Sequence, residues 1–164
     1  MSFKSMARAM TAAVFAGFAL CAAAQQGPML YGAPISLDTA KKAVAATAAE
    51  ARKNGWLMAI AVTDPNGHLL YFERMDGTQI GSVNIAIRKA QTAAQFKRPS
   101  KVFQDLIAKG DAFTYLLGLE GAMPVQGGLP IVMDGRIVGA LGVSGATGDQ
   151  DTQCAIAGLD ALKR

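Results

Sequence analysis

The sequence predicts an α+β domain in which helices pack on a central antiparallel sheet. Two pairs of apolar segments flank the turn signals Asp64-Pro65-Asn66-Gly67 and Asp134-Gly135-Arg136. Asn-Gly and Asp-Gly between apolar runs are typical of β-hairpins. Segments with helical spacing lie before, between and after these hairpins. Strands joined as hairpins, with helices in separate blocks, favour an antiparallel sheet over a doubly wound parallel one.

The N-terminal two dozen residues have the composition of a secretory signal peptide. Lys4 and Arg8 give a basic start, residues 10–20 form an apolar stretch too short to span a bilayer, and Ala22-Ala23-Ala24 is an A-x-A cleavage site before Gln25. We expect the mature protein to be periplasmic or secreted, without a stable membrane anchor after cleavage. The predicted organisation is a signal peptide over residues 1–24, a flexible lead over 25–34 and a single domain over 35–164.

Charge and cysteine content argue against several classes of function. Loss of Lys4 and Arg8 lowers the formal net charge from +4 to +2, too weak a balance for a nucleic-acid-binding protein. Leu20 stands where a lipoprotein signal needs a small residue before Cys21. Cys154 is then the only thiol, so we expect no intramolecular disulfide and a buried helical position for it. With one histidine and one mature cysteine, a zinc or iron–sulfur site is not expected.

The first helix and the first hairpin follow the lead. We expect Ser36 to cap a helix that ends at Asn54-Gly55, with one apolar face formed by Leu37, Ala40, Val44, Ala48 and Ala51. Residues 56–62 form a nearly continuous apolar run, as expected of a strand covered on both faces. Residues 68–73 return the chain, and Arg74-Met75-Asp76-Gly77 follows them.

The remaining elements are three helical segments, a second hairpin and a terminal helix. We predict a helix capped by Ser82 and running to about Phe96, a short helix over 100–109, further helical turns over 112–119, strands over 129–133 and 137–143, and a last helix capped by Asp149 or Asp151. A fifth strand is expected near Gln79 or Val125.

Glycines recur every third residue at positions 139, 142, 145 and 148. Glycine inside a strand marks the close approach of another backbone or of a ligand, so this segment either packs tightly against alanine-rich helices or faces a ligand. It lacks the spacing and the parallel βαβ context of a dinucleotide fingerprint, and no nucleotide is expected. Residues 142–146 also lack the final glycine of a nucleophile elbow, which argues against a serine hydrolase.

Three further features could bind a ligand. Arg74 and Asp76 place opposite charges where a strand ends, as one wall of a pocket or as a local ion pair. Gly127 and Gly128 form either an anion-binding nest or a simple loop. His68, just after a turn, is either a solvated surface residue or, if the hairpin end faces a pocket, an iron ligand. The basic residues Arg88, Lys89, Lys97, Arg98 and Lys101 suit a solvated helix face or an anion site.

Several segments, taken in order, resemble the GlcG/HbpS family, often described as haem-binding or "haem-degrading", which includes the C-terminal domain of PduO-type proteins. The segments are Val62-Thr63-Asp64, Asn66-Gly67, Arg74-Met75-Asp76-Gly77, Lys89-Ala90-Gln91-Thr92-Ala93, Gly127-Gly128-Leu129-Pro130-Ile131, Gly139-Ala140-Leu141-Gly142-Val143-Ser144-Gly145 and Gln150-Asp151. The resemblance implies a profilin- or PAS-like sandwich, assembly into homo-oligomers and, for secreted members, haem binding and redox sensing.

The resemblance also implies a ligand site and a function. The matching site residues are Arg74, Asp76, Lys89, Thr92, Ser100, Gly127, Gly128 and Pro130. Ser100 is a candidate metal ligand by this resemblance, and His68 is one only by its place after the turn. We expect an exported protein that binds haem or a similar flat anionic molecule. Because no conventional nucleophile, base or metal set accompanies Arg74, binding is favoured over catalysis. The alternative is an enzyme or accessory subunit acting on a small carboxylate or corrinoid, in which Arg74 holds the carboxylate and Asp76 or Lys89 moves a proton.

Overall fold

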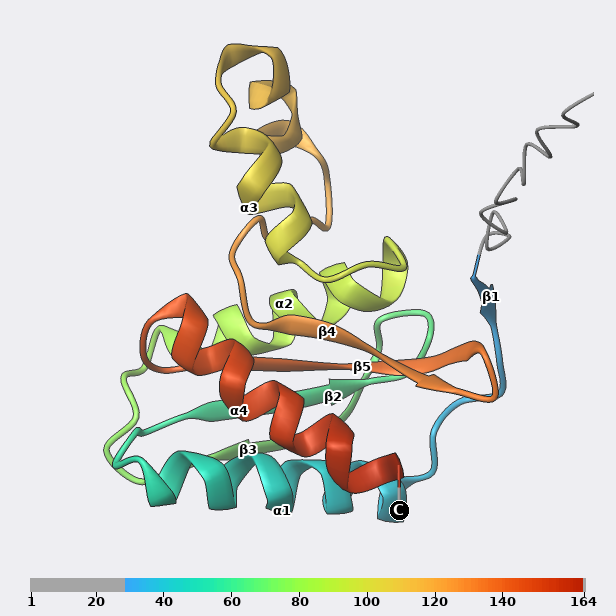
Figure 1. Ribbon diagram of the computed structural model, residues 1–164, viewed down its shortest axis with the longest axis vertical. Helices are drawn as coiled ribbons and strands as arrows, with labels where there is room; N and C mark the ends of the chain where they lie inside the picture. Colours follow the sequence, from blue (N-terminus) through green and yellow to red (C-terminus); the bar gives the residue numbers. More distant parts are fainter. Residues whose placement is uncertain (1–28, 164) are drawn as a thin grey trace, which may run out of the picture.

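A computed structural model describes residues 29–163. The predicted signal peptide and the first four residues of the lead, 25–28, lie outside these residues. In chain order the elements are β1 (Leu30–Tyr31), α1 (Leu37–Lys53), β2 (Ala59–Thr63), β3 (Leu69–Arg74), α2 (Ser82–Gln95), α3 (Lys101–Ile107), the 3₁₀ helix η1 (Asp111–Gly118), β4 (Gly128–Met133), β5 (Arg136–Ser144), α4 (Gly148–Asp160) and the 3₁₀ helix η2 (Ala161–Lys163). The α+β prediction is therefore confirmed (Figure 1).

The sheet of the described residues has five strands and is mixed. β5 lies at its centre and pairs antiparallel with β2 on one side and with β4 on the other, while β3 pairs antiparallel with β2. Both predicted hairpins are present. Asp134 and Gly135 adopt positive φ at the β4–β5 turn, and in the first turn only Gly67 does so.

The fifth strand was predicted in the wrong place. It is β1 in the lead, which pairs parallel with β5 through Leu30 and Tyr31, and neither Gln79 nor Val125 lies in a strand. The sheet is therefore mixed and not purely antiparallel. The sequence could not indicate β1, because a strand of two residues is too short to show an alternating pattern. Its position depends on distant contacts, since the Tyr31 hydroxyl contacts the carbonyl oxygens of Ala94 and Gln95 at 3.0 Å.

Helices cover both faces of the sheet. On one face α1 and α4 enclose the main core, in which Val44 and Cys154 pack with Ile60, Leu141 and Val143. On the other face the alanines of α2, Ala86 and Ala90, pack on Ala59 and Ala61 of β2 (Figure 1). Every residue of β2 is buried, which confirms that this strand is covered on both sides.

The predicted cap of α1 is confirmed, and two other predicted caps are wrong. The Ser36 hydroxyl accepts a hydrogen bond from the amide of Thr39 at the start of α1. At α2 the cap position belongs to Gly81, and Ser82 lies inside the helix. At α4 Thr147 forms a capping box with Gln150, whereas the aspartates sit in the first turn.

Close packing explains the glycines of β5. A Cβ atom on Gly142 would lie 2.1 Å from the carbonyl oxygen of Ala86, and one on Gly139 would lie 2.4 Å from the carbonyl oxygen of Thr63. On Gly145 it would lie 2.0 Å from the carbonyl oxygen of Leu57. Real Cβ atoms do not approach other atoms this closely, so of the two predicted roles for these glycines the structure supports tight packing.

Candidate functional site

Five of the sequence-predicted site residues gather where α2 crosses the start of β4. The centre of this region is an ion pair between Lys89 of α2 and Asp151 of α4, with 2.7 Å between Nζ and Oδ2. The Lys89 ammonium also donates to the carbonyl oxygen of Val143 at 3.0 Å, and the amide of Ala146 donates to Asp151 Oδ1 at 3.1 Å. Lys89 is only 1% exposed. The pair therefore joins α2, β5 and α4 inside the protein.

Burial dominates the electrostatics of this pair. It lowers the pKa of Lys89 and raises the pKa of Asp151, and in each case the effect outweighs the attraction of the opposite charge. Removing two charges from water is costly, and their mutual attraction repays this cost only in part. Lys89 and Asp151 therefore form a closed structural link, with no opening through which a ligand could reach the ammonium in this conformation.

The start of β4 packs closely against Lys89 at Gly127 and Gly128, and Ser100 holds it there by hydrogen bonds. The Ser100 hydroxyl donates to the carbonyl oxygen of Val125 at 2.7 Å and accepts from the amide of Gly128 at 2.9 Å. A Cβ on Gly128 would lie 2.2 Å from the carbonyl oxygen of Lys89. The buried Ser100 hydroxyl and the Gly128 amide are therefore already engaged within the protein, as the Lys89 ammonium is.

Thr92 and Pro130 lie on either side of this centre. The Thr92 hydroxyl, one turn beyond Lys89 on α2, donates to the carbonyl oxygen of Arg88 at 2.7 Å and accepts from the amide of Met123 at 2.7 Å. Pro130 lies in β4 opposite Ala140 and is half-buried. Of the predicted residues in this part of the fold, Pro130 is the one that reaches a surface groove.

Arg74 and Asp76 lie in a different part of the molecule. Arg74 ends β3, which is separated from β4 by β2 and β5, and three strand spacings amount to about 14 Å. Both side chains are exposed, and together with Arg52 and Glu73 they line an open depression of about 350 Å³. Arg52 pairs with Glu73 at 3.4 Å, whereas no ion pair joins Arg74 to Asp76. Of the two alternatives for Arg74 and Asp76, the local ion pair is therefore not present.

An apolar groove between β4 and the C-terminal helices was not predicted. It has a volume of about 510 Å³ and is lined by Pro130, Ile131, Val132, Met133, Asp134, Leu159, Leu162 and Lys163. The Met133 and Val132 side chains are exposed, so Met133 does not pack in the core. Two apolar residues, Val132 and Met133, directly before an Asp-Gly turn are the one signal that could have indicated this groove.

The other side chains that could bind a metal ion do not lie together in the described part of the chain. The His68 side chain is largely exposed, and its Nδ1 lies 3.2 Å from Asp64 Oδ2. Within residues 29–163 no group of three or more histidine, cysteine or carboxylate side chains is placed to hold a metal ion. Cys154 is buried and free, as predicted, and burial raises its pKa to about 11.

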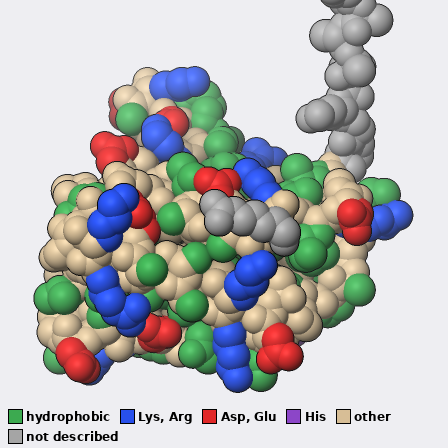
Figure 2. Space-filling model, turned by 60° about the horizontal axis from the view of Figure 1, so that its bottom comes forward, with side chains coloured by type: hydrophobic (Ala, Val, Ile, Leu, Met, Phe, Trp, Pro, Cys, Tyr) green, Lys and Arg blue, Asp and Glu red, His purple; other side chains and the backbone are tan. Residues whose placement is uncertain are grey.

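Surface charges are mixed in sign. Lys89 is buried while Arg88, Arg98 and Lys101 are exposed, so the basic residues of this segment do not form one face. On the side of the molecule that carries α1 and α4, basic and acidic side chains lie interspersed with apolar ones (Figure 2). No helix among the described residues is both long and apolar enough to cross a membrane.

Comparison with known proteins places these features in a family. The family described as "Haem degrading protein HbpS-like" matches residues 35–160. The chain is 39% identical to protein GlcG of Escherichia coli K12 over 110 residues, which cover 67% of this chain and 81% of GlcG. It is also 29% identical over 108 residues to the corrinoid adenosyltransferase PduO of Salmonella typhimurium, of which the match covers only 31%.

Solved structures show the same fold. A double mutant of Streptomyces reticuli HbpS is 34% identical, with a TM-score of 0.73, and the match covers 84% of this chain and 93% of that one. Klebsiella pneumoniae protein ORFY is 28% identical, with a TM-score of 0.76 and coverage of 80% and 92%. A PduOC–heme complex is 23% identical, with a TM-score of 0.72 and coverage of 78% and 94%, and shows likeness in fold alone.

Proposed function

Because the chain belongs to the HbpS-like family, we propose that it is an exported protein that binds haem or a similar flat anionic molecule, in haem handling or redox sensing. Support comes from the family's description as haem-degrading and from the 34% identity to HbpS. In this proposal the sheet with helices on both faces is a profilin- or PAS-like sandwich. Export is tested by recovering the protein from the periplasm and determining its N-terminal residue. Cleavage is expected near Gln25.

The groove between β4 and α4 carries the proposal. Ligand pockets usually have volumes of about 300–1,000 Å³ and mainly apolar walls with a few polar anchors. The groove, of about 510 Å³, has apolar walls from Pro130, Val132 and Leu159. Lys163 at its end forms an ion pair with Asp160 at 2.8 Å, but both side chains are exposed, so exchange of this partner for a carboxylate of the ligand would cost little. Met133 adds a thioether, a group that ligates haem iron in some proteins, so the residues of the groove fit the group.

The polar groups around the buried Lys89–Asp151 pair are poorly suited to bind a ligand, which favours the groove as the binding site. The Lys89 ammonium, the Ser100 hydroxyl and the Gly128 amide are hydrogen-bonded within the protein. A ligand that used them would have to break buried hydrogen bonds, each of which leaves an unsatisfied polar group at a cost of about 1–3 kcal/mol. Binding in the groove leaves these contacts intact.

Titration with hemin tests the proposal. The mature protein should give a saturable shift of the Soret band, because an apolar groove removes the porphyrin from water. Val132→Asp, which puts a charge in the groove, should weaken the affinity at least tenfold. Leu69→Asp is the matched control, since Leu69 is 48% exposed and Val132 is 45% exposed. An unchanged free-hemin spectrum, or equal effects of the two substitutions, would contradict the proposal.

The depression at Arg74 favours a second candidate function. Arg74 and Asp76 are exposed and not paired with each other, so they remain able to bind a small carboxylate or corrinoid in an enzyme or accessory subunit. Lys89 cannot move a proton for such a substrate in this conformation because it is buried. A panel of short dicarboxylates and cobalamin should raise the melting temperature of the wild type and not of Arg74→Met. No stabilisation by any of these compounds would contradict this alternative.

A further inference from the structure

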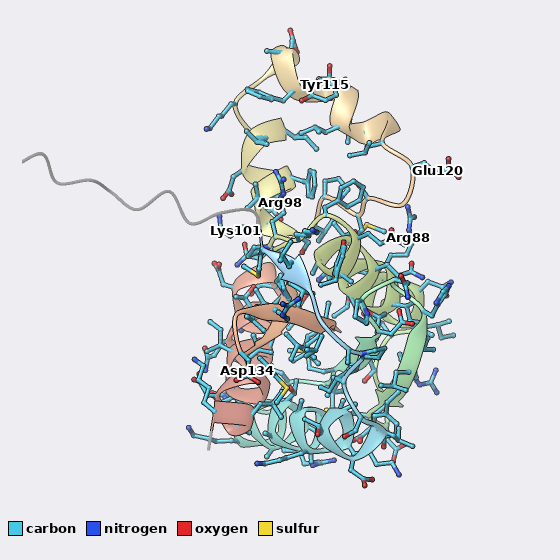
Figure 3. The ribbon with its side chains drawn as sticks, turned by 90° about the vertical axis from the view of Figure 1, so that its right-hand side faces the viewer. Arg88, Arg98, Lys101, Tyr115, Glu120 and Asp134 are labelled. Atoms are coloured by element: carbon cyan, nitrogen blue, oxygen red, sulfur yellow. The ribbon has the colours of Figure 1, made fainter. Side chains whose placement is uncertain are left out.

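The groove between β4 and α4 contains an oxidisable side chain. Among the described residues that line it, Met133 is the only one with a sulfur atom. Met133 is the last residue of β4 and pairs with Arg136 across the turn. Figure 3 shows Asp134, the next residue along the chain, at the exposed end of this hairpin. A peroxide in the surrounding solution can therefore reach the thioether of Met133 while the protein stays folded.

The methionines of the described residues differ in exposure. Met133 and Met29 are each 39% exposed, whereas Met58 is completely buried in the main core. Met75 and Met123 are half-buried, and the Met75 sulfur accepts a hydrogen bond from the amide of Met58 at 3.4 Å. Because a thioether is oxidised only on contact with the oxidant, Met133 and Met29 should react first. Met29 lies in the lead and does not line the groove.

Met133 lies where a change in its polarity affects the groove. It lines the groove of about 510 Å³ and also a neighbouring depression of about 320 Å³, which is formed by the lead, the start of α1 and Arg136. Its neighbours in the groove include the apolar side chains of Leu159 and Leu162. Oxidation converts the apolar thioether into a polar sulfoxide, and a polar group in apolar surroundings is costly unless it is hydrogen-bonded. The oxidised groove is therefore less suited to a flat apolar ligand.

We propose that Met133 is a site of reversible oxidation by peroxides, and that its sulfoxide lowers the affinity of the groove for its ligand. This inference rests on the proposed function of the groove. The sulfur lone pair attacks one peroxide oxygen, the O–O bond breaks as the S–O bond forms, and the proton of the transferred oxygen passes to the departing oxygen. Sulfur loses two electrons, and the peroxide gains them and leaves as water or an alcohol.

The oxidation of Met133 can be reversed by chemistry that also balances. Methionine sulfoxide reductases return a sulfoxide to the thioether. Two thiols supply the two electrons and become a disulfide, and the sulfoxide oxygen leaves as water. The groove would then recover its apolar wall, so the modification acts as a switch and not as permanent damage.

Peptide mapping by mass spectrometry tests whether Met133 is the reactive site. The mature protein is treated with dilute hydrogen peroxide, and catalase then removes the oxidant. Met133 and Met29 should each gain one oxygen atom, at least tenfold faster than the buried Met58. A denatured sample, in which all three should react alike, is the control. A Met133 that reacts as slowly as Met58 would overturn the proposal, and this result does not depend on what the groove binds.

The effect of oxidation on binding is measured with two probes. One is hemin, and the other is anilinonaphthalene sulfonate, an aromatic anionic dye without iron that fluoresces in apolar sites. Oxidation should weaken the binding of both to the wild type at least tenfold, and treatment with the reductase should restore it. Met29→Leu removes the equally exposed methionine outside the groove and should show the same loss. Met133→Leu should bind equally before and after peroxide treatment.

Failure of this inference can be distinguished from failure of the proposed function. If untreated protein leaves the hemin spectrum unchanged, the haem proposal fails, and the dye still reports the state of the groove. The part of the dye signal that comes from the groove is the part that Val132→Asp removes. Equal binding of the dye to untreated and oxidised wild type, or an equal loss of binding in Met133→Leu, would overturn the inference.

Discussion

The buried ion pair offers the sharpest test of how this fold is held together. Lys89 and Asp151 are almost completely buried and 2.7 Å apart, and they join α2 to α4 across the end of β5. Lys89→Met keeps most of the apolar stem and removes the charge. Asp151→Leu removes the partner and fills a comparable volume. The two single variants and the double variant form a cycle that separates the pair from the individual side chains.

The structure sets the expected magnitudes. Each single variant leaves one buried charge without its partner, which costs about 3–5 kcal/mol of unfolding free energy. The double variant leaves no buried charge, and replacement of such pairs by apolar groups is neutral or stabilising by about 1–4 kcal/mol. The loss in each single variant lowers the melting temperature by roughly 10–20 °C for a domain of this size.

Urea unfolding followed by circular dichroism measures these free energies. The exposed pair of Lys101 and Asp105 on α3 provides the matched control. Loss of an exposed pair at this helical spacing changes stability by only about 0.3–0.5 kcal/mol. Single variants at Lys89 or Asp151 that cost less than about 1 kcal/mol would show that the ion pair does not hold these elements together. A double variant that is less stable than both single variants would refute the reasoning on burial.

The pKa directions give this experiment a pH dependence. A carboxyl whose pKa is raised on folding, as for Asp151, favours the fold below its ordinary value of 3.8 and loses this contribution as pH rises through the folded pKa. An amine whose pKa is lowered, as for Lys89, contributes above 10.5 and loses this as pH falls through its folded pKa. The advantage of the double variant over the wild type should therefore be greatest near neutral pH and shrink toward both extremes.

Three further outcomes follow from individual contacts. Gly128→Ala should cost about 3 kcal/mol or more, because its Cβ would meet the backbone of Lys89; an unchanged urea midpoint would contradict this. Thr147→Ala should lose about 1 kcal/mol with the capping box of α4, measured by thermal unfolding against Thr114→Ala, which caps no helix. Cys154, with a pKa of about 11 and no exposed surface, should react with a disulfide reagent at pH 8 only in denaturant. Stoichiometric labelling of the native protein would show that the thiol is accessible.

The sequence predicted the elements of this fold where local patterns carry information. Continuous apolar runs and Asn-Gly or Asp-Gly turns located both hairpins, and Ser36 located the start of α1. β1 escaped prediction because its two residues owe their conformation to β5 and to contacts of Tyr31 with α2. The cap of α4 was misplaced by a few residues because threonine and aspartate both cap helices, and only the geometry selects Thr147.

The candidate site was harder to predict because charge in a sequence does not reveal burial. Lys89 stands in a run of basic residues that suits a solvated helix, yet it is the largest fully buried side chain among the described residues. The reason is Asp151, which lies 62 residues further along the chain. The groove at Met133 was missed for a related reason, since its walls come from a hairpin and from the C-terminal end of the chain.

Most of the residues that carry the family resemblance differ from those that line the groove between β4 and α4; only Pro130 and Ile131 belong to both sets. Lys89, Gly127 and Gly128 pack α2 against the start of β4 and exclude larger atoms, so selection for this fold alone would preserve them. The Met133 and Lys163 side chains line an open groove and have few such constraints. A relative could therefore keep the whole motif and bind a different molecule. The motif is evidence for the fold, and the ligand has to be read from the groove, where Val132→Asp separates binding from folding.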